Sequence, residues 1–272
     1  MIDILWAILF GIVEGLTEWL PISSTGHLIL VEEFVHMDVS KAFMEMFRVV
    51  IQLGAIMAVV VLYFHRLNPF SPKKTEPQKK ETLSLWGKVI VACIPCIPIL
   101  PLNNKIDATF YNYKVVAMML ILYGILFIVV ENRNRHRVPA MCKIAQIDYK
   151  TALIIGVFQA LAVIPGTSRS GATILGAILI GLSRETAAEF TFFLAIPTMF
   201  GASLLKMWKF GSAFTPHEVV ILLTSVAVSF LVSIVAIRFL VGYVKKHNFK
   251  PFGYYRIALG ALVLCYFLAV PH

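Results

Sequence analysis

Charged residues are scarce in this chain. Asp, Glu, Lys and Arg make up only 14% of its 272 residues, whereas about a quarter is usual in a soluble domain. Hydrophobic residues make up 59%, and the mean hydropathy is +0.82. This composition excludes an ordinary soluble domain. Apolar runs at 49–64, 115–130 and 219–244 suit helices that cross a bilayer, so the sequence predicts an all-α integral membrane protein with a single membrane domain over 1–272.

The sequence also predicts neither a cleavable signal peptide nor a disulfide framework. No basic segment precedes the first apolar run, and Glu14 and Glu18 interrupt that run. The four cysteines lie mostly in apolar segments. Cys93 and Cys96 have the spacing of a redox motif, but they lie in an expected membrane helix, so we interpret them as packing residues.

Acidic residues are fewer than basic ones, 15 against 24, and the net charge is +9. The basic residues fall in discrete loops between apolar runs, a pattern typical of membrane orientation and not of nucleic-acid binding. Sixteen of them lie in the segments 65–88, 131–150 and 238–256, the last of which ends at Arg256. Six others lie in the connections that alternate with these segments along the chain. The positive-inside rule therefore predicts a cytoplasmic position for the sixteen and an outside position for both termini.

Two short apolar segments break at a proline and carry unusual polar residues. The first reads Glu14-Gly-Leu-Thr-Glu18-Trp-Leu-Pro21-Ile-Ser23-Ser24-Thr25-Gly26-His27. The second reads Gln159-Ala-Leu-Ala-Val-Ile-Pro165-Gly-Thr-Ser168-Arg169-Ser170-Gly171-Ala-Thr173. Gly11 and Gly156 open the two segments 145 residues apart, and paired broken segments of this kind indicate a site at a repeat interface inside the bilayer.

The charge distribution and the broken segments together predict the topology. We expect six transmembrane helices plus two re-entrant helical hairpins in an inverted-topology repeat. The first repeat covers 1–131, with the hairpin 4–35 and three spans. The second covers 149–272, with the hairpin 149–182 and three spans. The two polar loops would then meet near the bilayer midplane, where non-helical backbone is tolerated only inside protein or beside a water-filled cavity.

Glu14 and Glu18 are four residues apart and so share one helix face. A charged side chain at bilayer depth costs about 2.5–3.5 kcal/mol on insertion scales and is usually functional. Two carboxylates suit a divalent cation, Mg²⁺ or Ca²⁺, held beside substrate phosphates, and one of them is also a candidate general base. Two alternatives stay open: an interfacial pair that faces water, and partners of a structural arginine.

The loop at 23–25 supplies three hydroxyl groups, and His27 adds an imidazole. A helix that begins at this loop presents free backbone N–H groups, which favour an anion. The serines are also ordinary N-cap residues, and the histidine alone fits a hydrogen-bonded core position. Beside two carboxylates, we interpret the cluster as part of a reaction site.

Arg169 lies between Ser168 and Ser170 at the expected start of a helix. A guanidinium flanked by hydroxyls is well suited to binding phosphate. Its alternative role is an ion pair with Glu14 or Glu18, which would join the two halves of the chain. Acids, hydroxyls and an imidazole from one half, with a cation from the other, favour phosphoryl chemistry over transport of a neutral solute.

At these two motifs the chain resembles the undecaprenyl pyrophosphate phosphatase family of the bacitracin-resistance type, and the resemblance extends over the whole chain. It implies hydrolysis of undecaprenyl pyrophosphate to undecaprenyl phosphate and inorganic phosphate with a divalent cation. This reaction recycles the lipid carrier of peptidoglycan synthesis and confers bacitracin resistance. One departure is Arg48, where an acidic residue is expected in much of the family.

The resemblance also implies a setting and partners. We expect a multi-pass protein of the bacterial plasma membrane whose active site faces outside. Its partners would be a polyprenyl pyrophosphate lipid and membrane lipids, with no nucleic acid; a homodimer is compatible with this setting.

Carried over by position, the resemblance implies a set of functional residues. The catalytic residues are Glu14, Glu18, Ser24, His27 and Arg169. The phosphate ligands are Ser23, Thr25, Gly26, Ser168, Ser170 and Thr173, and the metal ligands are Glu14 and Glu18.

The nucleophile and the function class each have alternatives. Ser24, His27 and a water molecule deprotonated near Glu18 are all candidate nucleophiles, and we favour Ser24. The alternative function is a lipid-phosphate transporter or flippase, because inverted repeats with broken helices are also a transporter architecture. Transport explains the cluster of hydroxyls and imidazole less well than hydrolysis does.

Overall fold

The computed structural model describes residues 2–211 and 214–269, without the side chains of 103, 104, 107 and 108. Residues 270–272, the end of the predicted second repeat, lie outside the described residues. Across the described ranges all extended elements are helical, and the only strand-like pairing is an isolated bridge between Met141 and Leu182. Six described segments are long and apolar enough to cross a membrane. The predicted all-α membrane fold with six transmembrane helices is confirmed at this level.

The first half of the chain contains α1 (Ile2–Thr17), α2 (Ser24–Phe34), α3 (Lys41–Val50), α4 (Gln52–Leu62), α5 (Phe64–Leu67), α6 (Glu76–Cys93), the 3₁₀ helix η1 (Ile94–Leu102), α7 (Asn103–Phe110) and α8 (Tyr113–Arg133). The second half contains η2 (Ile144–Gln146), α9 (Tyr149–Ala160), η3 (Leu161–Val163), α10 (Arg169–Leu179), α11 (Arg184–Phe210), α12 (Pro216–Val244) and α13 (Lys250–Ala269). The six candidate spans are α3 with α4, α6 with η1, α8, α11, α12 and α13.

Side-chain caps fix several helix starts. Asp148 and Ser183 accept hydrogen bonds from the third residue of α9 and of α11. Thr215 and Glu218 form a capping box at α12, where Pro216 supplies a helical φ angle at the first position. In η1, Pro98 and Pro101 remove backbone donors, so this end of the span continues as a 3₁₀ helix.

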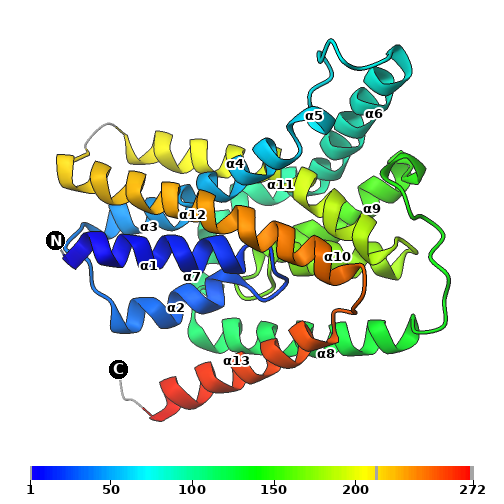
Figure 1. Cartoon of the computed structure of the whole chain (residues 1–272). Coiled ribbons are helices and arrows are strands. Elements are labelled where there is room, and N and C mark those ends of the chain that lie inside the picture. Colours follow the sequence, from blue (N-terminus) through cyan, green and yellow to red (C-terminus); the bar gives the residue numbers. More distant parts are fainter. Residues whose placement is uncertain (1, 212–213, 270–272) are drawn as a thin grey trace.

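The short helices α1 and α9 each pack closely against a long span from the other half of the chain. In Figure 1, α1 runs beside α12, and a Cβ added at Gly11 would lie 2.7 Å from the carbonyl oxygen of Ser225. The matched glycine of α9, Gly156, would place a Cβ 2.2 Å from the carbonyl oxygen of Ala92 in α6. Glycine at these two positions lets the helix backbones approach, as is common within membranes.

The two broken segments share an unusual backbone conformation. Ser23 and Ser168 have φ angles of 72° and 68°, and no other non-glycine residue in the described ranges has a positive φ. Each serine directly precedes a helix of 11 residues, α2 or α10. A positive φ is uncommon outside glycine, so the 145-residue match in sequence is also a match in local geometry.

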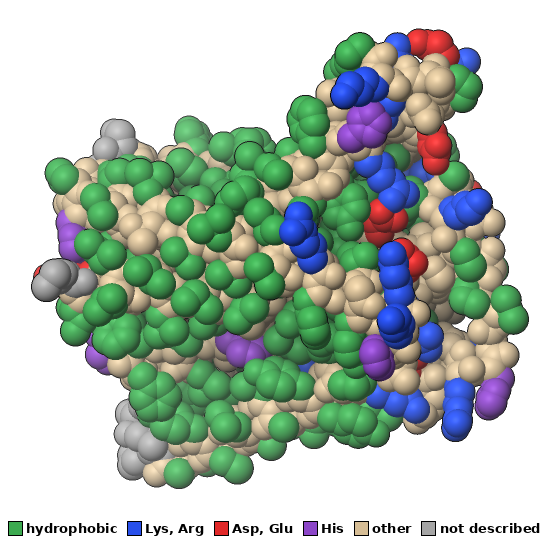
Figure 2. Space-filling view, viewed as in Figure 1, with side chains coloured by type: hydrophobic (Ala, Val, Ile, Leu, Met, Phe, Trp, Pro, Cys, Tyr) green, Lys and Arg blue, Asp and Glu red, His purple; other side chains and the backbone are tan. Residues whose placement is uncertain are grey.

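The molecule has two chemically different ends. The start of α1 and the end of α13 lie at the same end in Figure 1. Figure 2 shows Lys and Arg side chains gathered at the opposite end, over α5, α6 and the connections that follow α8 and α12, whereas hydrophobic side chains cover most of the remaining visible face. This asymmetry agrees with the unequal distribution of basic residues in the sequence.

Two of the sixteen basic residues assigned to an aqueous face are placed differently. Lys88 is buried and donates to the carbonyl oxygen of Ala145 (3.3 Å). Arg256 is fully buried within α13 and donates only to backbone carbonyl oxygens in the described residues. Both side chains are buried because each finds acceptors inside the protein, so neither contributes an exposed charge to that face. The other fourteen still outnumber the six residues of the alternate connections.

Candidate active site

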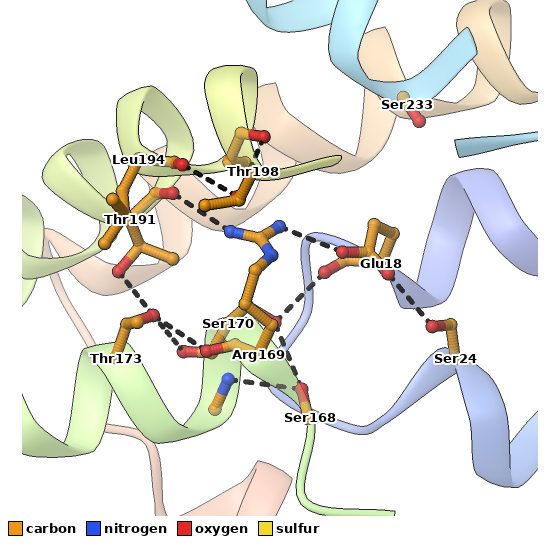
Figure 3. Close-up of polar contacts among 12 residues, drawn as sticks. Glu18, Ser24, Ser168, Arg169, Ser170, Thr173, Thr191, Leu194, Thr198 and Ser233 are labelled. Carbon is orange, nitrogen blue, oxygen red and sulfur yellow. Dashed lines mark hydrogen bonds and ion pairs between the residues drawn. The ribbon is translucent and has the colours of Figure 1, made fainter. Parts of the chain in front are cut away.

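The polar ends of the two broken segments meet in the interior. Figure 3 shows Glu18 and Ser24 opposite Ser168, Arg169 and Ser170, with the N-terminal ends of α2 and α10 on either side. Glu18 directly follows α1, and its N–H still donates to the carbonyl oxygen of Glu14 (3.0 Å). The predicted juxtaposition of the two motifs is therefore present in the structure.

Glu18 is the centre of these contacts. Its Oε1 accepts a hydrogen bond from Arg169 Nη2 (2.9 Å), and its Oε2 accepts one from Ser24 Oγ (2.9 Å). Ser170 Oγ donates to the Glu18 backbone oxygen (3.0 Å). The Glu18 and Arg169 side chains are only 9% and 13% exposed, so solvent screens the ion pair weakly. The ion pair left open by the sequence is thus formed with Glu18.

Arg169 is also held by Thr191 and Trp19, which the sequence pattern does not single out, and by the predicted residue Thr173. Its Nη1 donates to the carbonyl oxygen of Thr191 (3.1 Å), and its guanidinium carbon lies 5.7 Å from the ring centroid of Trp19. The Thr191 hydroxyl donates to Thr173 Oγ1 (3.0 Å), which in turn donates to the Arg169 backbone oxygen (2.8 Å). These contacts fix the guanidinium beside Glu18 and leave its Nε without a hydrogen-bond partner among the described residues.

Glu14 and Ser23 have polar atoms that are not satisfied. Glu14 is fully buried, and neither carboxylate oxygen has a hydrogen-bond partner in the described part of the chain. Ser23 Oγ is likewise buried without a partner. Unpaired buried oxygens are costly, and hard oxygen atoms are the ligands that Mg²⁺ and Ca²⁺ prefer. The oxygens of Glu14 and Ser23 therefore fit a divalent cation in chemical type, but no group of three acidic, His or Cys side chains suited to a metal occurs in residues 2–211 and 214–269.

His27 is engaged through both ring nitrogens. Its Nδ1 lies 2.8 Å from the Ser23 carbonyl oxygen, and its Nε2 lies 2.7 Å from the Tyr255 hydroxyl. Because a carbonyl oxygen only accepts, Nδ1 carries the proton of the neutral ring and Nε2 accepts from Tyr255. The two rings also stack, with centroids 5.6 Å apart. His27 therefore orients the loop at 23–24, and Tyr255 is a site residue that only the structure identifies.

The remaining predicted residues divide between capping and packing. Ser168 Oγ accepts from the N–H of Gly171 (3.1 Å) and so caps α10, a role that was not predicted for it from the sequence. Ser23 makes no such cap. Thr25 and Gly26 continue α2; Thr25 is half-buried, and Gly26 packs against Leu120.

An apolar groove of about 530 Å³ opens beside the loop that carries His27. Its lining includes Leu16 and Leu20 from the first segment and Phe239, Phe252 and Tyr255 from α12 and α13. His27 lines the groove as well, so one residue of the predicted catalytic set borders it. Figure 2 shows a furrow on this face between α1 and α13.

The fold and the site together define a class: a polytopic helical membrane protein in which two broken segments bring carboxylate, hydroxyl, imidazole and guanidinium groups to one buried centre. Comparison with known proteins gives the family. The chain belongs to the family described as bacitracin resistance protein BacA, whose model matches residues 7–262.

Three similar proteins of matching length are each named undecaprenyl-diphosphatase. The undecaprenyl-diphosphatase of Acetivibrio thermocellus is 63% identical, covering 99% of this chain and 100% of its own length. That of Enterococcus faecalis is 61% identical, covering 97% and 98%. That of Lactiplantibacillus plantarum is 57% identical, covering 99% and 100%.

Proposed function

We propose that this protein hydrolyses undecaprenyl pyrophosphate to undecaprenyl phosphate and inorganic phosphate, recycles the lipid carrier for peptidoglycan synthesis and thereby confers bacitracin resistance. The observation that carries the proposal is the position of Glu18, which contacts the Ser24 hydroxyl through one carboxylate oxygen and the Arg169 guanidinium through the other. This is the arrangement of a nucleophile, a base and an orienting cation. Full-length relatives at 57–63% identity carry the corresponding name.

Ser24 is the proposed nucleophile because its hydroxyl already donates to a carboxylate. Glu18 takes the Ser24 proton as Oγ attacks the terminal phosphorus; the new Oγ–P bond forms while the P–O bond to the lipid phosphate breaks. The lipid monophosphate leaves with the proton from Glu18. Glu18 then takes a proton from water, which attacks the phosphoserine, and Ser24 leaves with that proton as inorganic phosphate is released.

His27 suits orientation better than attack. Its Nε2 accepts from Tyr255 and its Nδ1 donates to Ser23, so neither nitrogen is free to approach phosphorus. Arg169 stabilises charge on the transferred phosphoryl group. The N-terminal ends of α2 and α10, on either side of the centre (Figure 3), add partial positive charge for the same anion.

Glu14 and Glu18 are the proposed protein ligands of a Mg²⁺ or Ca²⁺ ion, with Ser23 nearby. The support is the pair of unpaired, fully buried oxygens of Glu14. Such an ion supplies Lewis-acid stabilisation of phosphate oxygens when it is bound. The apolar groove beside His27 would hold the first isoprene units of the substrate, because His27 borders it and Leu, Phe and Tyr side chains line it.

The proposed topology is an inverted repeat in which α1–α2 and α9–α10 are re-entrant hairpins, within repeats 1–131 and 149–272. The shared positive φ at Ser23 and Ser168 and the matched close packing at Gly11 and Gly156 support it. Both termini and the active site would face outside, because basic residues gather at the opposite end (Figure 2). A variant that keeps Cys142, which is exposed in the α8–α9 connection, as its only cysteine tests the orientation. A membrane-impermeant maleimide should label it in inverted vesicles and not in intact spheroplasts; the reverse pattern would reject this orientation.

Phosphate release from undecaprenyl pyrophosphate by purified protein in detergent tests the function. We expect release by the wild type that EDTA removes and added Mg²⁺ or Ca²⁺ restores. Glu14→Gln keeps the size of the side chain but weakens metal binding, so it should raise the metal concentration needed for half-maximal activity at least about tenfold. A substrate with a much shorter prenyl chain should react with a higher KM if the groove holds the chain.

The controls separate the proposals from one another. The conservative variant Glu45→Gln changes a carboxylate in α3, outside the site, and should leave the metal dependence unchanged. Full activity in EDTA would reject the metal and retain the hydrolase. A folded wild type that releases no phosphate but moves a lipid phosphate across vesicles would replace the hydrolase with the transporter alternative.

A further inference from the structure

Arg256 is the most deeply buried cation of the described chain that the mechanism above does not use. It lies in α13, its side chain is fully buried, and none of the ion pairs among the described residues includes it. An unpaired buried charge is costly unless hydrogen bonds replace its hydration. All of its hydrogen bonds in the described chain go to backbone carbonyl oxygens.

These carbonyl groups belong to both broken loops and to one span. In the first loop, Nη1 donates to Pro21 (3.2 Å). In the second loop, Nη2 donates to Gly166 (2.8 Å) and Thr167 (3.0 Å). The other two acceptors are Leu120 (3.4 Å) and Met119 (3.3 Å) in α8. One side chain thus links the two loops that form the site and fastens both to the same helix.

We propose that Arg256 is a positioning residue that sets the distance between the first broken loop, which leads to Ser24, and the second broken loop, which leads to Arg169. Its acceptors lie just before the strained positions: Pro21 is two residues before Ser23, and Thr167 directly precedes Ser168. A positive φ at a non-glycine residue persists only where the surrounding structure over-determines it. The guanidinium group of Arg256 constrains the backbone of both loops at once, through Pro21 on one side of the site and Gly166 and Thr167 on the other.

The guanidinium group is specifically suited to this role. It offers five N–H donors in a rigid plane, whereas a lysine ammonium offers three donors on a flexible stem. The plane also lies 5.6 Å from the ring centroid of Tyr123, and Nη1 would be 3.3 Å from a Cβ added at Gly171. Lysine would keep the charge but lose part of the link between the loops.

The kinetic part of this inference rests on the proposed phosphatase activity, so its test has two independent readouts. The first is kcat and KM for Arg256→Lys and Arg256→Met. We expect kcat to fall about 10²-fold in the lysine variant, because small displacements of reacting groups cost this much, with KM changed only a few-fold. The methionine variant should lose more.

The second readout is hydrogen–deuterium exchange of the purified proteins. Amides at 22–25 and 167–170 should exchange faster in Arg256→Lys, while exchange in α8 and α13 stays as in the wild type. Arg184→Met is the matched control, because it breaks the ion pair of a partly exposed arginine with the buried Glu131 outside the site. It should keep kcat and leave both loops protected.

Each outcome decides the inference. Near-wild-type kcat and loop exchange in both Arg256 variants would overturn it. Aggregation of both variants, or faster exchange throughout the bundle, would also overturn it by making Arg256 a residue of general stability. If the wild type released no phosphate, the proposed function would fail, while the exchange data would still test the link between the loops.

Discussion

Arg169→Met is expected to lower kcat/KM about 10³- to 10⁵-fold, the range found for arginines that stabilise a transferring phosphoryl group. The guanidinium is aligned before substrate binds, with Nη2 on Glu18 and Nη1 on the Thr191 carbonyl oxygen. Its Nε has no partner in the described chain and is therefore a donor available for a phosphate oxygen. Methionine retains apolar volume but removes the charge and every donor.

Arg169→Lys separates charge from geometry. A lysine keeps the positive charge but cannot hold Glu18 and Thr191 at once while it donates to a phosphate. We therefore expect activity in the order wild type, lysine variant, methionine variant, measured as phosphate release per folded molecule. Arg48→Met is the control, because Arg48 also forms an ion pair, with Glu32, but outside the contacts of the site. Arg169→Met with activity within tenfold of the wild type would remove Arg169 from the proposed mechanism.

The parts of the fold that sequence predicts well are those determined locally. The breaks between α1 and α2 and between α9 and α10 follow from Pro21 and Pro165 and from the Ser- and Gly-rich residues after them, since such residues end helices over a few positions. Span lengths follow from apolar runs, and the runs at 115–130 and 219–244 lie within α8 and α12. The matched spacing of Ser23 and Ser168 is also present in sequence, although their positive φ angles appear only in the structure.

Long-range contacts account for what the sequence pattern misses. Arg256 follows Lys245, Lys246 and Lys250, so it belongs to a basic segment by position. Its acceptors lie from 89 to 235 residues away, and no local pattern reports such a pairing. Tyr255 contacts His27 from 228 residues away. Helix-face periodicity does not predict the burial of Arg256 either. In a membrane helix, a buried polar side chain interrupts the apolar sequence in the same way as an exposed one.

Identical residue types in matched positions can also differ in role. Ser23 and Ser168 share a backbone conformation, yet only Ser168 caps its helix. The difference leaves Ser23 Oγ buried and without a partner among the described residues, in the loop that follows Glu18. Residue type and spacing cannot distinguish a capping hydroxyl from one that is free to bind a ligand, whereas the hydrogen-bond partners can.

Ser24→Ala is expected to lower kcat at least about 10³-fold, because loss of a nucleophile leaves only the residual catalysis of binding and electrostatics. The variant also removes the hydrogen bond to Glu18, so folding must be checked by thermal unfolding in detergent. His27→Gln is the matched variant from the same loop. It removes the imidazole but leaves Ser24 and Glu18 in place, and the expected loss of kcat is about tenfold.

Acid quenching during turnover of substrate labelled in its terminal phosphate identifies the nucleophile directly. Wild type and His27→Gln should both retain acid-stable label on protein, since a phosphoserine survives acid, whereas Ser24→Ala should retain none. Acid-labile label that disappears in His27→Gln would assign the attack to His27. An active wild type that carries no label under either condition would assign it to water, and Ser24 would then act only as the donor that orients Glu18.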